Sequence, residues 1–253
     1  MMPTSKSGRP GPSIRLFIAS DLAERAMHDC DADQTNYLAT VLRLDAGAEL
    51  LVFNGRDGEW LAEIAEVGRR TCRLRAIKRL RPQMDGPDLH YLFAPLKRSR
   101  LDYMVQKATE LGVARLAPVM TRRTQAERVN LDRMRANAIE AAEQCGVLRI
   151  PEVAEPEKLD RVLAAWPTGR RLIFCDEAAD IASPLAALGT IAPGSPMAVL
   201  IGPEGGFTVE ERDALVSVPG VVRISLGPRI MRADTAAVAI LALTQAVMGD
   251  WGN

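Results

Sequence analysis

Apolar and polar positions follow two patterns along the chain, and these predict two parts of different architecture. Up to about residue 80, short apolar runs lie between turn residues such as Asn-Gly and Asp-Gly, a pattern typical of β-strands joined by tight turns. Beyond residue 88, apolar runs alternate with helical patterns, which indicates an α/β sheet. The predicted strands cover residues 14–18, 50–53, 60–64, 72–77, 89–94, 113–119, 171–175, 197–201 and 221–226, and the predicted helices about 32–43, 99–111, 130–145 and 235–248.

These patterns divide the chain into four segments. Residues 1–13 form a tail rich in Pro, Gly and Ser that we expect to be disordered. Residues 14–81 form a small β-rich domain. Residues 82–88 contain two prolines and a glycine and are the predicted linker, and residues 89–249 form the α/β domain.

A glycine loop follows the apolar run Met197–Ile201. This run of five is too short for a typical helix and is stopped by Gly-Pro, so it predicts a central strand. Gly205 and Gly206 let the backbone approach a ligand that a Cβ atom would exclude. Thr208 and Glu211 then have the spacing of a capping box, which predicts that a helix begins just after the loop.

A second turn repeats this plan. The strand predicted at 221–226 ends at Gly227, and an almost wholly apolar helix is predicted from about Thr235 to Met248. Ligands of open α/β sheets bind at the carboxyl ends of the strands. We therefore expect the two turns to line one composite pocket.

Two phrases of this region carry a resemblance to a known family. Residues 202–211 read GPEGGFTVEE and residues 225–237 read SLGPRIMRADTAA. They are similar to the two signatures of the small-subunit (16S) ribosomal RNA uracil-N3-methyltransferases, a branch of the SPOUT class. The resemblance covers roughly residues 14–248, and further matching positions are Arg15, Phe17, Lys97, 105–113, Pro118, 121–123 and 141–144.

The resemblance implies a SPOUT trefoil-knotted α/β domain preceded by a small PUA-like β-barrel. It also implies that S-adenosyl-L-methionine (SAM) binds to the two glycine loops, mostly through backbone groups. A knot is a rare exception to ordinary chain topology, and nothing in the periodicity predicts one. The alternative for the glycines is that they only close tight turns. The cofactor-binding residues that the resemblance implies are Leu200, Ile201, Gly202, Gly205, Gly206, Leu226, Gly227, Ile230 and Met231.

Methyl transfer to a uracil nitrogen requires positioning of the acceptor, removal of its proton and stabilisation of the resulting anion. Arg232 and Asp234 are the candidate catalytic residues. The usual family phrase reads Ile-Leu-Arg-Thr-Glu-Thr-Ala, whereas this chain has Ala233 and Asp234, so the carboxylate has a shorter reach. Asp234 could instead be the N-cap of the last helix. Glu204 could brace its loop or orient the cofactor.

Recognition of RNA requires cations for its phosphates. The resemblance implies five such residues, Arg15, Arg43, Lys97, Arg122 and Arg123. In addition, residues 69–81 hold seven basic side chains and no acidic one, which indicates either a phosphate-binding strand or a solvated face.

Charge distribution and cysteine content limit the ligands and partners that the sequence predicts. Residues 1–149 carry 24 Lys and Arg against 19 Asp and Glu (+5), and residues 150–253 carry 8 against 13 (−5), so the first part is the better partner for a nucleic acid. The four cysteines have no C-x-x-C spacing and only two histidines exist, so no metal site or disulfide framework is predicted. Without a signal peptide or an apolar run long enough to span a membrane, we expect a cytoplasmic protein.

The resulting prediction is a SAM-dependent methyltransferase that acts on N3 of a uridine in small-subunit ribosomal RNA, within the assembled subunit. The apolar last helix and Trp251 indicate a homodimer, as the resemblance also implies. Two alternatives stay open: a SPOUT methyltransferase with another RNA acceptor, and a catalytically silent RNA-binding or ribosome-assembly factor. A phosphate-binding nucleotide loop is disfavoured because no Lys-Ser/Thr follows the glycines.

Overall fold

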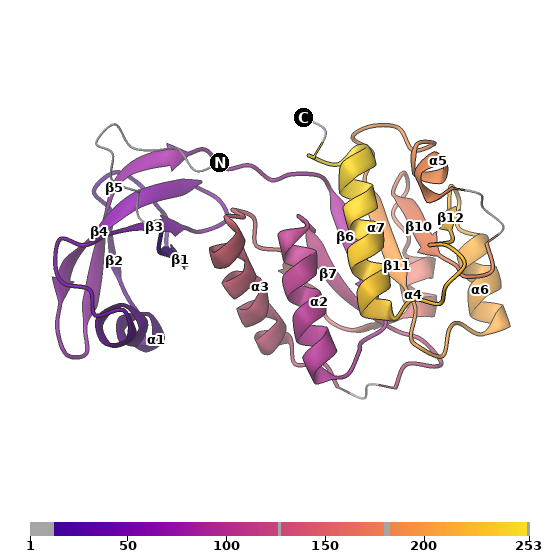
Figure 1. Cartoon of the computed structure of the whole chain (residues 1–253), viewed down its shortest axis with the longest axis horizontal. Helices are drawn as coiled ribbons and strands as arrows, with labels where there is room; N and C mark the ends of the chain where they lie inside the picture. The colour runs from indigo at the N-terminus through magenta and orange to yellow at the C-terminus, as the bar shows by residue number, and fades with distance from the viewer. Residues whose placement is uncertain (1–12, 126–127, 180–182, 252–253) are drawn as a thin grey trace. The chain divides into compact units, whose positions relative to one another are not determined.

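The computed structural model describes residues 13–125, 128–179 and 183–251 (Figure 1). The chain forms two compact units, one of residues 1–85 with 143–149 and one of residues 86–142 with 150–253. The predicted disordered tail lies outside the described residues except for Ser13. The first unit ends at Asp85, inside the segment predicted as a linker, but the pattern did not predict that Glu143–Arg149 groups with this unit.

The first unit contains a five-stranded sheet in the order β1-β3-β4-β5-β2. Strands β1 and β3 pair in parallel, and the other neighbouring strands pair antiparallel. Alternate side chains of β5, such as Cys72 and Leu74, are buried, as the pleat of a strand with one face on a core requires, and the strand predicted at 72–77 is confirmed. The strands are β1 (Arg15–Phe17), β2 (Met27–Asp29), β3 (Glu49–Phe53), β4 (Glu59–Val67) and β5 (Cys72–Arg81).

The helix predicted over 32–43 is a short α-helix that continues as a π-helix. The α-helix α1 (Ala32–Thr35) begins at a capping box formed by Asp31 and Gln34. The π-helix η1 (Asn36–Val41) follows without a break. Helical periodicity does not distinguish the two hydrogen-bond patterns, so the sequence predicted the element but not its type.

The second unit contains a parallel sheet in the order β12-β10-β11-β6-β7-β8, with β9 paired to β7 (Figure 1). The predicted α/β class is therefore confirmed. Two of these strands, β8 and β9, have two residues each and were not predicted. The strands are β6 (Leu89–Phe93), β7 (Arg115–Met120), β8 (Glu152–Val153), β9 (Glu157–Lys158), β10 (Arg171–Cys175), β11 (Met197–Ile201) and β12 (Val222–Ile224).

Helices cover both faces of this sheet. One face packs against α2, α3 and α7 in an apolar cluster that includes Tyr91 and Val199. The other face, which carries Leu92 and Leu200, packs against α4 and α6. Adjacent residues of one strand thus serve opposite faces, as the pleat requires. The helices are α2 (Arg98–Glu110), α3 (Leu131–Cys145), α4 (Leu159–Ala164), α5 (Pro184–Leu188), α6 (Val209–Val216) and α7 (Ala233–Met248).

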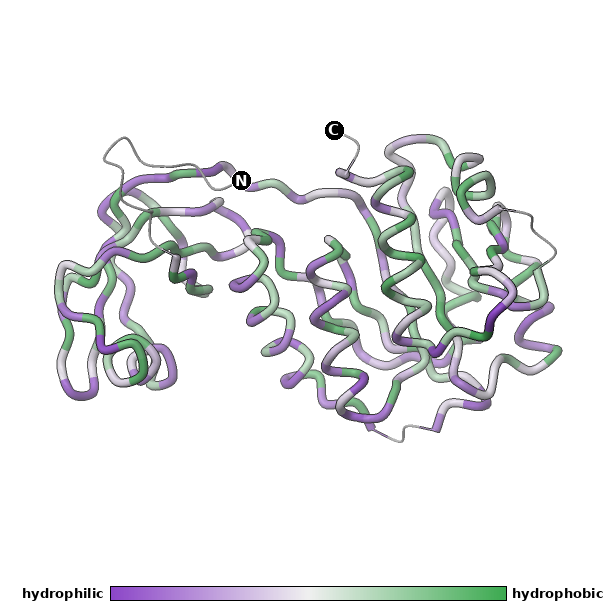
Figure 2. The backbone as a smooth tube through the Cα atoms, viewed as in Figure 1, coloured by the Kyte–Doolittle hydropathy of each residue, from purple (hydrophilic) through white to green (hydrophobic). Residues whose placement is uncertain are grey.

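Helix α7 is hydrophobic along most of its length (Figure 2). It buries Ile240 and Leu241 completely or almost so, which agrees with the nearly all-apolar pattern predicted for it. No helix among the described residues is both long and apolar enough to cross a lipid bilayer. Strand order does not report how the chain is threaded, so the trefoil knot stays a prediction.

Candidate active site

A pocket of about 530 Å³ lies at the carboxyl edge of the sheet, where β11, β10 and β12 end. Because β10 lies between the other two strands, the residues that follow it close the gap between the two glycine loops. The segments that line the pocket are 174–178, 201–207, 224–227 and 229–233, together with Arg123, Arg212 and Ala236. The two turns therefore form one composite pocket, as expected.

Eight of the nine predicted cofactor-binding residues line this pocket. They are Ile201, Gly202, Gly205, Gly206, Leu226, Gly227, Ile230 and Met231. Leu200 does not line it, because its side chain packs on the opposite face of the sheet against α4 and α6. Ile230 is 92% exposed, so its side chain is available to a ligand rather than to the core.

Two glycines of the loops have backbone conformations that favour glycine. Gly206 has a φ of +68° and Gly227 a φ of +103°, and a Cβ atom at either position would project into open space. Gly202 differs, because a Cβ atom there would lie 2.5 Å from the ring of Phe207. The loops thus combine an open backbone surface with one tightly packed turn.

The first loop is held from two sides. At its end, the carboxylate of Glu211 accepts hydrogen bonds from the backbone N–H groups of Thr208 and Arg122, at 2.9 and 2.7 Å. This confirms the predicted capping box and adds a tie to the segment after β7. On the other side, Arg123 donates to the carbonyl oxygen of Gly205 at 2.7 Å.

Glu204 has a side-chain partner in the loop region. Its carboxylate lies 3.3 Å from the guanidinium of Arg100 on α2. Both side chains are partly exposed, so this pair contributes little to stability. The pair directs the Glu204 side chain toward α2, and whether Glu204 braces the loop or orients the cofactor stays a prediction.

Asp176 was not predicted as a site residue. Its carboxylate is 4% exposed and accepts hydrogen bonds from Arg212 on α6, at 3.3 and 3.0 Å, and from Arg223 on β12, at 2.9 Å. Burial raises the pKa of Asp176, but the hydrogen bonds from Arg212 and Arg223 outweigh this and the net pKa is lowered. The available signal was its position directly after the predicted strand 171–175.

The structure places the two candidate catalytic residues at the start of α7. Arg232 is exposed, lines the pocket and is the N-cap residue, without a side-chain capping bond. Asp234 lies inside the first turn, so its alternative assignment as N-cap is wrong. Its Oδ1 atom accepts from the backbone N–H of Thr235 at 3.0 Å, and it is not among the lining residues.

The predicted RNA-binding residues of the second unit lie near the same edge of the sheet. Lys97 is the exposed N-cap residue of α2, four residues beyond β6. Arg122 and Arg123 are also exposed and follow β7. Since parallel strands end at a common edge, these three cations share the edge that carries the pocket.

Arg15 does not fit the predicted RNA-binding role. Its side chain is 7% exposed and is ion-paired with Glu59 at 2.8 Å. Its other guanidinium nitrogens donate to the carbonyl oxygens of Glu143 and Val147, at 2.9 and 3.1 Å. We correct this prediction, because Arg15 is committed to the interior of the first unit. A sequence match to a basic position does not reveal such burial.

Arg43 is exposed and has a left-handed backbone conformation, with a φ of +53°. This conformation is uncommon for a residue with a Cβ atom and is often found at functional sites.

The basic side chains of residues 69–81 fall into two groups, those with an ion-pair partner and those without one. Arg73, Arg75 and Arg81 pair with carboxylates of the first unit, whereas Arg69, Arg70, Lys78 and Arg79 are exposed and have no ion pair among the described residues.

The described residues contain no group of three or more His, Cys, Asp or Glu side chains that could hold a metal ion. None of the four cysteines, all of which the structure describes, forms a disulfide bond. The polar groups that line the pocket are backbone groups, the Ser225 hydroxyl, arginines and carboxylates, which suit an organic ligand with hydrogen-bonding groups.

Comparison with known proteins agrees with this arrangement. Residues 84–245 match the family model of an RNA methyltransferase domain, and residues 30–77 match that of an RNA methyltransferase PUA domain. The ribosomal RNA small subunit methyltransferase E of Rickettsia conorii is 31% identical, over 90% of this chain and 93% of its own.

Two solved structures share the fold over nearly the whole chain. A putative methyltransferase from Legionella pneumophila, solved in complex with its cofactor SAM, is 29% identical, with a TM-score of 0.81 over 94% of this chain and 98% of its own. A ribosomal RNA small subunit methyltransferase E from Neisseria gonorrhoeae is 23% identical, with a TM-score of 0.81 over 94% and 99%. From both family matches, the full-length relative and the shared fold, we conclude that the chain belongs to the RNA methyltransferase family, with its PUA domain followed by its methyltransferase domain.

Proposed function

We propose that this protein is a SAM-dependent methyltransferase that methylates N3 of a specific uridine in small-subunit (16S) ribosomal RNA. The observation that carries the proposal is that both signature loops line one pocket at the carboxyl edge of the sheet. The Rickettsia relative is named for activity on small-subunit ribosomal RNA, and the Legionella protein was solved with SAM.

The residues of the pocket fit SAM. The open Cβ positions of Gly206 and Gly227 leave room for a ligand against the backbone. Apolar Leu226 and Met231 suit an adenine ring or a thioether chain, and the lining peptides offer hydrogen-bonding groups. When bound, SAM supplies a methyl group on a positively charged sulfur.

The protein's part in the reaction is positioning and charge control. Displacement at a methyl carbon is fast only when the attacking nitrogen is held in line with it. The exposed guanidinium of Arg232 stabilises the negative charge on a uracil oxygen after N3 loses its proton.

Asp234 takes the N3 proton in this proposal. Asp234 does not itself line the pocket, and three other carboxylates do. Asp176 accepts from two arginines, Glu204 pairs with Arg100, and Glu177 follows β10 rather than the start of α7, where Arg232 lies. A carboxylate whose pKa is lowered by two guanidinium groups is a weak base. Asp234 has no ion pair among the described residues and lies two positions from Arg232.

Exposed cations of both units form the proposed RNA contacts. In the first unit these are Arg43, Arg69, Arg70, Lys78 and Arg79, and in the second unit Lys97 and Arg122. Arg123 has a double role in the proposal, because it braces Gly205 and lines the pocket. Sequence-specific RNA recognition targets unpaired bases that can be turned out of a stack, which suits a loop of an assembled ribosomal subunit in the cytoplasm.

A homodimer is part of the proposal. Tyr103 on α2, Val247 on α7 and Trp251 are apolar side chains that are 46%, 38% and 57% exposed. Helices α2 and α7 pack side by side on one face of the sheet, so these side chains offer an apolar surface to a second copy. Light scattering at micromolar concentration tests this, and a monomer mass contradicts it.

The test of function is to incubate the protein and SAM with small subunits that lack base methylation, and to digest the RNA for mass spectrometry. We expect N3-methyluridine with the wild type and none with Arg232→Ala, while SAM affinity changes little. Arg161→Ala is the matched control, because Arg161 is exposed on α4 and does not line the pocket. Another methylated nucleoside favours a different acceptor, and RNA binding without any methylation favours a silent assembly factor.

A further inference from the structure

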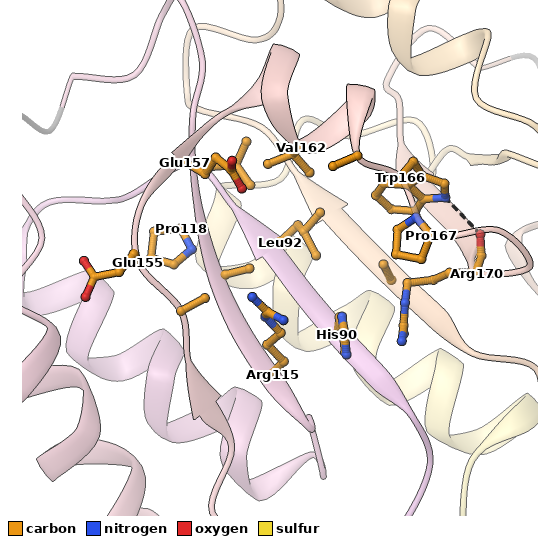
Figure 3. Close-up of a pocket in the computed structure, with 15 residues that line it drawn as sticks. His90, Leu92, Arg115, Pro118, Glu155, Glu157, Val162, Trp166, Pro167 and Arg170 are labelled. Atoms are coloured by element: carbon orange, nitrogen blue, oxygen red, sulfur yellow. Dashed lines mark hydrogen bonds between the residues drawn. The ribbon is translucent and has the colours of Figure 1, made fainter.

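The second unit contains another pocket, of about 190 Å³, on the face of the sheet that α4 covers (Figure 3). It reaches His90 and Arg115, which lie at or next to the amino-terminal ends of β6 and β7. The candidate active site lies at the opposite edge of the same sheet. The two pockets have no lining residue in common.

This pocket exists because the sheet is only partly covered. Helix α4 has six residues and is therefore only about 9 Å long, roughly half the length of a five-residue strand, so it leaves part of the sheet face uncovered. Beneath the uncovered part, the floor is made by Ala117, Ala198 and Leu92. The two alanines lie on β7 and β11, on either side of β6, and their small side chains leave a hollow with an apolar base.

One wall of the pocket is a fixed aromatic ring. The indole N–H of Trp166 donates to the carbonyl oxygen of Arg170 at 3.0 Å (Figure 3). Arg170 is itself held by the carboxylate of Asp88, at 3.1 and 2.9 Å, and donates to the carbonyl oxygen of Met197. Since its single donor is satisfied, Trp166 can present its ring to a ligand without reorganisation.

Two arginines line the pocket, and since Arg170 is held by Asp88, the one available to a ligand is Arg115. Its guanidinium lies 3.7 Å from the carboxylate of Glu152, which is beyond hydrogen-bond distance, and no residue that the structure describes accepts a hydrogen bond from it. Its side chain is 40% exposed. A guanidinium with free donors beside an aromatic wall suits an anionic group that accepts two parallel hydrogen bonds, such as a phosphate.

We propose that this pocket binds a nucleotide, with its base against Trp166 and its phosphate on Arg115. A flat ring joined to a phosphate is the chemistry that an aromatic wall, an alanine floor and a guanidinium with free hydrogen-bond donors recognise together. The volume of about 190 Å³ is below the roughly 300–1,000 Å³ of sites for drug-sized ligands, so the pocket takes at most one nucleotide and leaves part of it in solvent.

The acidic residues of the pocket set the orientation of the ligand. Glu155 and Glu157 lie on the side away from Trp166 and Arg170, and the guanidinium of Arg115 lies between the two groups (Figure 3). Two carboxylates repel a phosphate, so the phosphate lies on the other side of Arg115, toward His90 and Arg170, where the one carboxylate, Asp88, is already paired with both side chains. The nucleotide comes either from a strand of RNA, a source that rests on the proposed function, or from the free nucleotide pool.

The test is calorimetric titration of the full-length protein with UMP and AMP, and with uridine and inorganic phosphate as half-ligands. We expect the better nucleotide to bind at least about ten-fold more tightly than either half-ligand, and Arg115→Gln to lose about ten-fold of that affinity. Trp166→Leu should lose a similar factor, and Trp166→Phe should retain most of the affinity because the ring is kept. Arg161→Gln on α4, outside the pocket, should bind as the wild type does.

The proposal is overturned if neither nucleotide binds, or if Arg115→Gln binds the nucleotide as tightly as the wild type does. A second measurement separates the two sources of the ligand. If the nucleotide belongs to RNA, Arg115→Gln raises KM for RNA and leaves kcat and SAM affinity unchanged, and if it is free, KM for RNA stays the same. Titration needs no turnover, so a protein that binds UMP or AMP in this pocket but methylates nothing refutes the proposed function alone.

Discussion

The backbone N–H of Arg122 donates to Oε1 of Glu211 at 2.7 Å, although the two residues are 89 positions apart. The other oxygen of this carboxylate caps the first turn of α6 through Thr208. Glu211 is 4% exposed, so both hydrogen bonds are shielded from water. One buried carboxylate thus fixes the glycine loop to the end of β7.

Replacing Glu211 tests this link. Glu211→Ala leaves two backbone donors without acceptors, and we expect it to lower the free energy of unfolding by about 1–3 kcal/mol. Because the loop loses an anchor, SAM affinity should fall as well. Urea unfolding and calorimetric titration measure the two effects. Glu210→Ala is the control, since Glu210 is exposed in the same turn, and an equal loss of SAM affinity there contradicts the assignment.

The open glycines of the pocket allow a matched comparison. Gly206→Ala and Gly194→Ala each place a Cβ atom at a left-handed residue with open space around it, at φ values of +68° and +74°. Both variants should lose about 1 kcal/mol of stability. Only Gly206 lines the pocket, so only Gly206→Ala should also weaken SAM binding. Equal SAM affinities for the two variants exclude backbone contact at Gly206.

Local patterns predicted the elements that build the site. The strands β10 and β11 have the predicted bounds, and the capping box of Thr208 and Glu211 starts α6 as expected. Both signals are local, since an apolar run bounded by Gly and Pro and a four-residue cap need no distant partner. The common pocket followed from the rule that parallel strands end at one edge.

Distant pairings were not predicted. Asp176 meets Arg223 47 positions away, and Arg15 meets the carbonyl oxygen of Val147 132 positions away. No periodicity encodes such contacts, and so an arginine at a family position looked available for RNA when it is buried. The short elements β2, α4 and α5 were also missed, because three to six residues hold too little of a period.

Titration of Asp176 gives a pH dependence with a defined sign. Its pKa lies below the ordinary value of 3.8, since hydrogen bonds from Arg212 and Arg223 outweigh the effect of burial. A lowered pKa means that the stabilisation is present above 3.8 and is lost as pH falls through the folded-state value. Asp176→Asn should therefore be less stable than wild type at pH 7, and the difference should shrink below about pH 4. Thermal midpoints across pH measure this, and a constant difference contradicts it.

We expect the four cysteines to differ in their rate of reaction with a thiol reagent. Burial raises the pKa of Cys30 and of Cys175 to about 12, so their thiolate fractions are minute at neutral pH. Cys72 is buried, whereas Cys145 is exposed. A chromogenic disulfide reagent at pH 8 should modify one thiol quickly and the other three only on unfolding. Cys145→Ser should remove the fast phase, and a fast phase that persists in this variant contradicts the assignment.

Salt dependence distinguishes cations that contact RNA from those that hold the fold. Lys78 and Arg79 are exposed and have no ion pair among the described residues, so the double variant Lys78→Gln/Arg79→Gln should weaken RNA binding and reduce the slope of log Kd against log salt by about one to two. Its unfolding curve should match that of the wild type.

We expect Arg15→Gln to lower stability and to leave the salt dependence of RNA binding unchanged. It leaves the 6%-exposed carboxylate of Glu59 with Arg81 as its remaining ion-pair partner and removes the donors to Glu143 and Val147, so the unfolding midpoint should fall. Because Arg15 is buried, the salt slope of RNA binding should stay at the wild-type value, measured at a temperature where the variant is folded. A reduced slope for Arg15→Gln, with none for the double variant, would return Arg15 to the RNA surface and remove β5 from it.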